Sequence, residues 1–288
     1  MEIRNWNQPG RHPPSTLHPP ISTIQSPTSS IQPPISTIQP PTSSLHIPLT
    51  RARLRDLEEC PRRFWLRSLA QRPWPAAPLP ATLEAAAELG RRFHLVMHRH
   101  FLGLKVDAGL LPAELQEWWA TWERHPIPLP PGRCLPEITL SAPLEGARLL
   151  VRFDLLALAG DGRALILDWK TEKRPRSRAQ LAADIQTQLY PFVLAEASTA
   201  LAGYSIVPEQ IEMIYWQANR PTGQQTNQHR FPYSAGQHAA NRARFGGLAA
   251  RAQALRPDAD AEPPLINDLS ICARCTYRTY CGRERSSR

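Results

Sequence analysis

The spacing of apolar residues predicts a chain in which helices and strands alternate. Leu89, Phe93, Val96 and Met97 recur at helical spacing, which is typical of a helix with one buried face. After a proline-rich turn the period changes to two, as in strands. Helices are predicted over residues 50–59, from Pro61 onward, and over 82–104, 112–124, 177–200 and 234–255, and strands over 134–142, 147–159, 163–170, 211–217 and 226–232. The middle of the chain therefore has an α/β order: helix, three strands, helix, strand.

The first 48 residues differ from the rest of the chain. From Pro19 a seven-residue unit of Pro, Ser, Thr, Gln and Ile repeats four times. Proline in every unit excludes a helical coiled coil. Because the segment has few large apolar side chains, burial cannot offset the entropy of ordering it, so residues 1–48 are predicted to be disordered. Residues 49–288 are long enough for one domain with its own core.

The charge balance favours a polyanionic partner. Lysine and arginine total 34 against 25 acidic residues, a net charge of +9, and each phosphate that such residues neutralise releases condensed counterions. No run of 18 apolar residues occurs, so no membrane-spanning segment is expected. A secretory leader is not visible either, which predicts a cytoplasmic, reducing location.

Asp168 and Lys170 lie inside an apolar strand, where charged residues are disfavoured unless they are used. Being two apart, they project to one face, and Trp169 projects to the other. A hairpin centred on Asp161 would set Asp154 opposite Asp168, with Cβ atoms about 5 Å apart. Two carboxylates this close repel unless a cation lies between them, and Mg²⁺ prefers such oxygen ligands. The alternative is a salt-bridge cluster on a half-exposed sheet.

Four motifs in this order resemble those of the PD-(D/E)XK nuclease superfamily. The similarity is to the branch that contains RecB C-terminal nucleases, the AddB nuclease domain and CRISPR-associated RecB-like nucleases. It extends over roughly residues 50–285, although the second motif lacks the glycine that usually precedes its arginine. The matching segments are Gly90–His94, Val151–Asp154, Asp168–Thr171 and Gln186–Tyr190.

This resemblance implies a restriction-endonuclease-like αβββαβ core, a mixed central sheet flanked by helices. It also implies a site that binds Mg²⁺ or Mn²⁺ and cleaves DNA. The implied metal ligands are His94, Asp154, Asp168 and the backbone carbonyl of Trp169. Lys170 would be the catalytic lysine, Gln186 and Tyr190 would support the site or contact DNA, and Glu137 is a supporting candidate.

The cysteines predict a second metal site. Cys272, Cys275 and Cys281 are closely spaced in the tail, and Cys60 stands near the start of the folded part. Thiolates are soft ligands, and by themselves the residues favour zinc. The resemblance instead implies a 4Fe–4S cluster that joins the N- and C-terminal parts of the domain. Cys134, within a strand, is predicted to be a small core residue.

The expected function is metal-dependent hydrolysis of DNA phosphodiester bonds, in DNA repair and recombination or in CRISPR-related DNA processing. Single-stranded DNA is a candidate substrate, and a helicase or CRISPR-associated protein is a candidate partner, since the chain has no helicase motif. Two alternatives remain open: a catalytically silent DNA-binding module with a structural Fe–S or zinc site, and a zinc-stapled interaction protein. The arginines expected to follow the DNA backbone include Arg62, Arg63, Arg174, Arg176 and Arg178.

Overall fold

The computed structural model describes residues 47–74, 80–219, 228–255 and 262–283. The heptapeptide repeats, predicted to be disordered, lie outside these residues. The helices are α1 (Arg51–Glu59), α2 (Pro61–Phe64) with the π-helical turn η1 (Trp65–Leu69), α3 (Ala81–Phe101), α4 (Ala113–Arg124), α5 (Arg178–Ala182), α6 (Ile185–Ala202), α7 (Ala235–Ala254) and α8 (Leu269–Cys272), with short 3₁₀ turns η2 (Ala108–Leu110) and η3 (Pro208–Gln210). The strands are β1 (Leu49–Thr50), β2 (Gly132–Pro136), β3 (Thr139–Leu144), β4 (Ala147–Arg152), β5 (Leu155–Ala159), β6 (Ala164–Lys170), β7 (Ile211–Gln217) and β8 (Gln228–Pro232).

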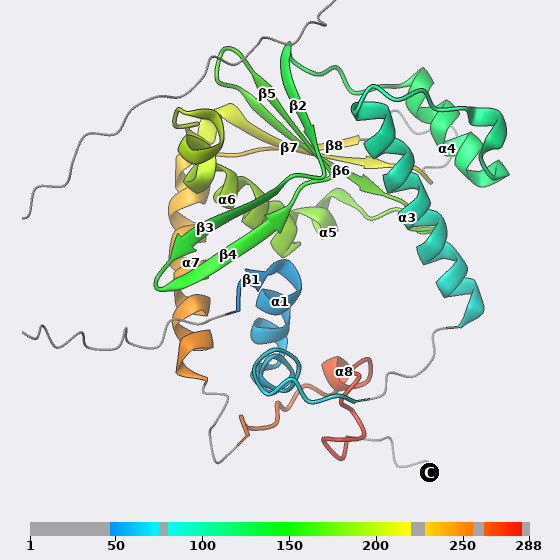
Figure 1. Cartoon of the computed structure of the whole chain (residues 1–288). Helices are drawn as coiled ribbons and strands as arrows, with labels where there is room; N and C mark the ends of the chain where they lie inside the picture. The colour runs from blue at the N-terminus through cyan, green and yellow to red at the C-terminus, as the bar shows by residue number, and fades with distance from the viewer. Residues whose placement is uncertain (1–46, 75–79, 220–227, 256–261, 284–288) are drawn as a thin grey trace, which may run out of the picture. The chain divides into compact units, whose positions relative to one another are not determined.

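The strands form two sheets (Figure 1). The larger sheet has the order β2-β5-β6-β7-β8, and the smaller one has the order β1-β4-β3. In the larger sheet β6 and β7 are parallel, whereas the other neighbours are antiparallel. The predicted mixed α/β class is therefore confirmed. The hairpin register is also confirmed, because Leu155 pairs with Leu167 and the ladder is centred on Asp161.

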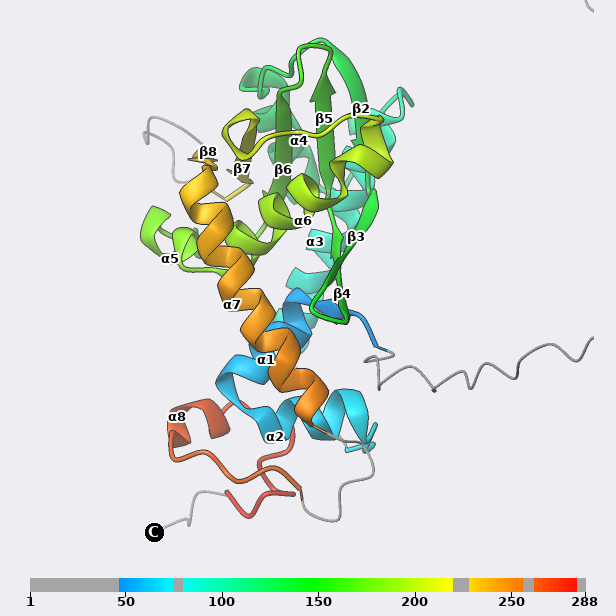
Figure 2. The same cartoon turned by 90° about the vertical axis from the view of Figure 1, so that its left-hand side faces the viewer.

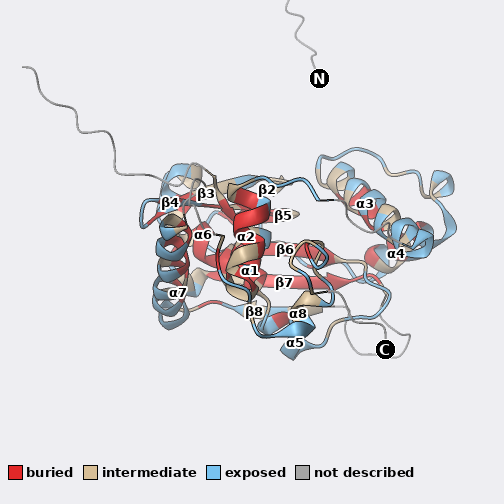
Figure 3. Ribbon diagram, turned by 90° about the horizontal axis from the view of Figure 1, so that it is seen from below, coloured by how far each residue is buried: buried red, intermediate tan, exposed pale blue. Residues whose placement is uncertain are grey.

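Helices cover both faces of the larger sheet and bury its central strands (Figure 3). On one face, Phe93 of α3 and three tryptophans of α4 pack against Trp169 and Trp216. On the other face, side chains of α6 and α7, such as Leu189 and Phe245, pack against Ile166. The side chains of β6 thus alternate between two cores, as its period of two predicts.

Two of the three predicted central strands are bent, which corrects their prediction as continuous strands. The stretch 134–142 divides into β2 and β3, and the stretch 147–159 divides into β4 and β5. The bends are paired: the Glu137 amide donates to the Asp154 carbonyl (3.0 Å), and the Phe153 amide donates to the Ile138 carbonyl (2.9 Å). Glu137 takes up the turn with a positive φ of 54°. Figure 1 shows β3 and β4 leaving the larger sheet together as a separate arm.

The helix predicted over 177–200 is also interrupted. The helix α5 ends at Ala182. Asp184 then caps α6 by accepting a hydrogen bond from the Gln186 amide (2.9 Å). The other predicted helices are confirmed with small shifts of their ends, and α3 ends at Phe101 rather than at residue 104. The prediction for Cys134 was wrong, because this residue is exposed on β2, at the edge of its sheet.

The first and last parts of the described domain contact each other. Figures 1 and 2 both place α8 and the C-terminal segment beside α2. Tyr277 donates a hydrogen bond to the Arg72 carbonyl (2.9 Å), and the Trp74 indole donates to Thr279 (2.9 Å). Tyr277 also packs with Trp65. No helix within the described residues is both long enough and apolar enough to cross a membrane.

Candidate active site

The predicted carboxylate and lysine of β6 lie in a buried polar network. Asp168 is only 4% exposed and forms an ion pair with Lys170. The side-chain amide of Gln186, at the start of α6, donates to Asp168 Oδ1 and accepts from Lys170 Nζ (3.1 Å). Both the nitrogen and the oxygen of the Gln186 amide are therefore hydrogen-bonded, and together they fix the positions of Asp168 and Lys170. The alternative of a half-exposed surface salt bridge does not describe a group this deeply buried.

Asp154 lies at the bend between β4 and β5, next to this network. Its Oδ2 atom accepts a hydrogen bond from the Trp169 amide (2.9 Å) and lies 3.3 Å from Nδ1 of His94. Donor atoms of His94, Glu137 and Asp154 lie within 4.8 Å of one another. The paired bends thus bring Glu137, the supporting candidate, to the same point as two predicted metal ligands.

His94 reaches this point because α3 passes very close to the end of β6. A Cβ atom at Gly90 would lie 2.7 Å from Oγ1 of Thr171, too near for an unaltered contact. Gly90 and His94 are one helical turn apart and share a face of α3. A glycine at the first position therefore lets α3 approach β6, and the histidine one turn later lies against Asp154.

The charges at the site shift the protonation of its groups. Burial and the negative charge of nearby Asp168 raise the pKa of Asp154, against the opposing hydrogen bonds from His94 and Trp169. Burial opposes the charged form of His94, but the hydrogen bond to Asp154 and its negative charge outweigh burial and raise the pKa of His94. Burial, together with the negative charges of Asp168 and Asp154, raises the pKa of Tyr190 and keeps its hydroxyl neutral.

These residues fit a hard divalent cation. The donors are carboxylate oxygens with one imidazole nitrogen, which suits Mg²⁺ or Mn²⁺. The buried Oδ2 atom of Asp168 is ion-paired with the Lys170 ammonium, and the negative charge of Asp168 helps to raise the pKa of Asp154. Two carboxylates that interact in this way repel unless a cation lies between them, so the pair suits a divalent ion.

The predicted site residues therefore lie where β5 and β6 meet α3 and α6, in two adjoining sets. His94, Glu137 and Asp154 form one group of donor atoms, and Asp168 belongs to the neighbouring network with Lys170 and Gln186. Tyr190 lies near this network on α6, with its ring edge-on to Phe153 (5.3 Å between centroids). Two contributors were not predicted. Arg152 forms an ion pair with Glu137 (2.5 Å), and the Tyr215 ring lies beneath the Lys170 ammonium (5.1 Å to the centroid). Tyr215 pairs with Asp168 across the parallel β6–β7 ladder, which no local pattern indicates.

Comparison with known proteins decides the family. The family model described as the PD-(D/E)XK nuclease superfamily matches residues 48–282. The chain belongs to the PD-(D/E)XK nuclease superfamily. Its mixed sheet flanked by helices is the restriction-endonuclease-like fold of that superfamily, as the sequence motifs predicted.

More distant similarities were found among solved structures. A protein of Eubacterium rectale, provisionally named an exonuclease, is 11% identical with a TM-score of 0.46, and the match covers 72% of this chain and 81% of that one. The protein SSO0001 is 14% identical with a TM-score of 0.37, over 81% of this chain and 84% of that one. No curated protein matches the chain.

The approach of α3 to β6 predicts a specific effect of a methyl group at Gly90. Gly247 of α7 serves as the control, because a Cβ atom there meets no described atom within 4 Å. Gly247→Ala should gain about 1 kcal/mol from helix propensity. Gly90→Ala should be less stable than this control by about 1–3 kcal/mol in urea unfolding, because the methyl group overpacks the contact with Thr171.

The same contact predicts a rescue. Thr171→Ala removes the close oxygen and leaves a Cβ atom 3.8 Å away, an ordinary contact distance. The double variant should therefore recover most of the loss, which is a non-additive result. Equal gains from Gly90→Ala and Gly247→Ala would show that α3 does not approach β6 at Gly90.

The raised pKa of His94 predicts that this residue titrates above the usual histidine value of about 6.5 in protein without divalent cations. A raised folded-state pKa stabilises the fold below the unfolded value, and this contribution is lost as the pH rises through the folded value. Mg²⁺ should lower the apparent pKa, because the cation and the proton compete for the site. NMR titration of the His94 ring checks both effects, with NaCl at matched ionic strength as the control. If Mg²⁺ leaves the pKa of His94 unchanged, His94 is not a ligand of the metal.

Proposed function

We propose that the protein is a metal-dependent deoxyribonuclease that hydrolyses phosphodiester bonds at the site around Asp154 and Asp168. The observation that carries this proposal is the buried Asp168–Lys170–Gln186 network beside the His94–Glu137–Asp154 group. Buried charged groups are costly, and clusters of them with shifted pKa values are typical of functional sites. Membership of the nuclease superfamily makes DNA the expected substrate.

In the proposed site, His94, Asp154, Asp168 and the Trp169 carbonyl would hold Mg²⁺ or Mn²⁺, with Glu137 in support. Such a cation would supply Lewis-acid stabilisation of the phosphate and would make a water molecule more acidic. Lys170 directs its ammonium at the attacking water or at the negative charge that develops on the phosphate. Gln186 positions Lys170 and Asp168 relative to each other, and the neutral hydroxyl of Tyr190 is available to donate a hydrogen bond to the substrate.

Within the superfamily, we place the chain in the branch with RecB-like and AddB-like nuclease domains and a 4Fe–4S cluster. The four motifs occur in the order of that branch, and all four cysteines implied by the resemblance line one cavity. Cys60 caps α2, where its Sγ atom accepts a hydrogen bond from the Arg63 amide (3.4 Å).

The sulfur atoms are not gathered as tightly as in a closed zinc site. In such a tetrahedral site, with Zn–S bonds of 2.3 Å, the sulfur atoms lie about 3.8 Å from one another, whereas no three of the cysteine sulfurs in the described chain have mutual distances within 4.8 Å. The resemblance of the motifs is therefore what supports the 4Fe–4S cluster over zinc, and metal analysis distinguishes the two.

The biological setting we propose is DNA repair and recombination or CRISPR-related DNA processing. Single-stranded DNA is the favoured substrate, and a helicase or a CRISPR-associated protein is the proposed partner.

Cleavage of labelled single-stranded and duplex DNA tests the proposed activity. Asp168→Asn removes a charge at unchanged size, and Lys170→Met removes the ammonium but keeps an apolar stem. Each should lower the Mg²⁺-dependent rate by about 100-fold or more, as the loss of one transition-state contact typically does. EDTA should abolish cleavage.

Asp161→Asn is the matched control, because Asp161 lies in the turn of the same hairpin and its side chain is exposed. It should cleave at the wild-type rate. If the wild-type protein, with its cysteine-bound metal intact, binds DNA but does not cleave it with Mg²⁺ or Mn²⁺, the silent DNA-binding module is the better description.

Metal analysis tests the cysteine site. Protein purified without oxygen should contain iron and acid-labile sulfide in equal amounts and absorb visible light, as Fe–S clusters do. Cys281→Ser should lose the iron and the sulfide. It should also unfold at a lower temperature, because the cluster that joins the N- and C-terminal parts of the domain has lost one ligand. Cys134→Ser, a cysteine outside the cavity, should keep the iron and the sulfide. One equivalent of zinc with no iron would contradict the cluster.

A further inference from the structure

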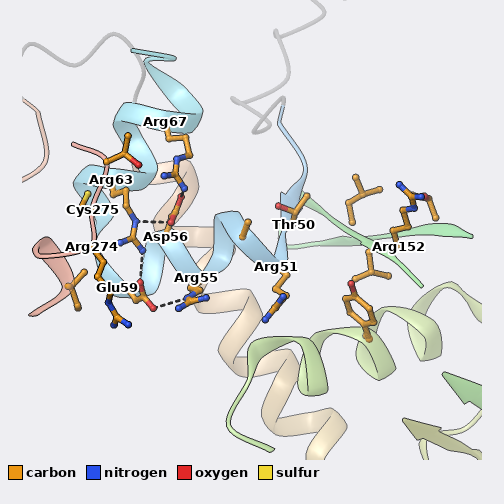
Figure 4. A pocket seen from close by; sticks show the side chains of 17 residues that line it. Thr50, Arg51, Arg55, Asp56, Glu59, Arg63, Arg67, Arg152, Arg274 and Cys275 are labelled. Carbon is orange, nitrogen blue, oxygen red and sulfur yellow. Dashed lines mark hydrogen bonds and ion pairs between the residues drawn. The ribbon is translucent and has the colours of Figure 1, made fainter. Parts of the chain in front are cut away.

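A groove lined by arginines adjoins the candidate active site. It runs between α1, the strand β4 and the C-terminal segment (Figure 4). Two carboxylates, Asp56 and Glu59, line it as well. Its arginines come from α1, α2, η1, β4 and the loop between Cys272 and Cys275: Arg51, Arg55, Arg63, Arg67, Arg152 and Arg274.

The ion pairs in the groove leave an excess of positive charge. Arg63 is largely buried and binds both Asp56 (2.7 Å) and Glu59 (2.5 Å). Arg67 shares Asp56, and Arg55 shares Glu59. Three guanidinium groups therefore share two carboxylates. Since the side chain of Arg55 is 58% exposed, it keeps donors that face solvent.

Two further arginines add to this excess. Arg274 is exposed and has no carboxylate partner within the described residues. Arg152 is 67% exposed, and it reaches from β4 to Glu137 at the candidate metal site. A guanidinium group binds phosphate oxygens through paired, charge-assisted hydrogen bonds, so exposed arginines along a concave surface suit a row of phosphates.

The groove is continuous with the candidate active site. Arg152 and Tyr190 line both the groove and the hollow that contains His94 and Asp154. At its far side, Cys275 and Arg63 line both the groove and the cysteine cavity. One wall of the groove is therefore formed by the loop that carries two of the proposed cluster ligands.

Resting on the proposed nuclease function, we propose that this groove binds the sugar-phosphate backbone of the substrate strand beyond the cleaved bond. Arg55, Arg152 and Arg274 contact its phosphates. The strand is single, because the aromatic ring of Tyr190 lines the groove together with the arginines and with half-buried apolar side chains such as Leu150 and Ile271. Unpaired bases can stack on an aromatic ring, whereas a duplex keeps its bases stacked inside.

The assignment changes which arginines are expected to contact DNA. Arg62 forms an ion pair with Glu262 and donates a hydrogen bond to the Pro263 carbonyl. Arg176 is paired with Asp184 (2.8 Å). Arg178 lies over the Phe231 ring, 4.6 Å from its centroid. These three groups, singled out from the sequence, already have structural contacts. Arg55 also has one, with Glu59, but it keeps exposed donors at the groove, and Arg274 lines the groove as an exposed residue.

Equilibrium binding without added divalent cation tests the groove apart from cleavage. Fluorescence anisotropy of a labelled oligothymidylate is measured with the full chain, its cysteine-bound metal intact, over a series of salt concentrations. The Arg55→Gln/Arg274→Gln variant should bind about tenfold or more weakly. The slope of log K against log salt should shrink by about 1.4, since each lost single-strand phosphate contact removes about 0.7.

Arg148→Gln is the matched control, because Arg148 is an exposed arginine of the same strand as Arg152 and hydrogen-bonds Ser141 outside the groove. It should bind as the wild type does. The single variant Arg274→Gln is a second check, because Arg274 is exposed and has no ion pair with any residue that the structure describes, so its loss should not disturb folding. It should shrink the slope by about 0.7. Circular dichroism melting verifies that each variant is folded.

The outcomes separate the groove from the nuclease function. If the wild type cleaves DNA and the double variant binds as tightly as Arg148→Gln, the proposal that the groove binds DNA is wrong, and the nuclease function is unaffected. If the double variant binds more weakly but the wild type does not cleave DNA, the proposal that the groove binds DNA is supported and the proposed nuclease function is wrong. Equally tight binding of a duplex of matched length would overturn the assignment to a single strand.

Discussion

The structure depends on the paired bends at Glu137 and Asp154. The two bent strands are tied by hydrogen bonds between Glu137 and Asp154 and between Phe153 and Ile138, so one cannot straighten without the other. Above the bends, β2 and β5 complete the larger sheet; beyond them, β3 and β4 form the smaller one with β1. This division brings Glu137 and Asp154 together at the end of β6, where α3 also arrives. Bends of this kind are features that re-aim side chains next to active sites.

The site is stabilised by the same contacts that prepare it for chemistry. Asp168 and Lys170 are buried charges that would be costly alone, but each is paired, and Gln186 bonds both. Asp154 and Asp168 remain close enough that the pKa of Asp154 is raised by burial and by the second charge. A divalent cation relieves this repulsion, and the nearby arginines of the groove carry the positive charge that a nucleic-acid strand requires. The scaffold, the proposed metal site and the proposed substrate path thus meet at one end of the larger sheet.

Much of this arrangement follows from the sequence, because it depends on periodicity. The alternation along residues 163–170 placed Asp168 and Lys170 on one face, and symmetry about Asp161 gave the hairpin register. The bends were missed because the alternation continues past both Glu137 and Asp154, although Pro136 directly before Glu137 is a residue that often ends a strand. The break at Asp184 was missed since apolar spacing persists through it. Partners of the arginines depend on contacts between distant segments, such as Arg62 with Glu262, which no local pattern contains.

The most direct test of the central claim is a crystal structure with Mn²⁺ at a concentration that supports cleavage, located by its anomalous scattering. The account predicts an ion at the bend, bound by a carboxylate oxygen of Asp154 together with a donor atom from Glu137, His94 or Asp168, and the loss of this ion in Asp154→Asn. An ordered Mn²⁺ bound elsewhere in an active crystal, with the bend free of metal, would contradict the claim that the paired bends build the catalytic site.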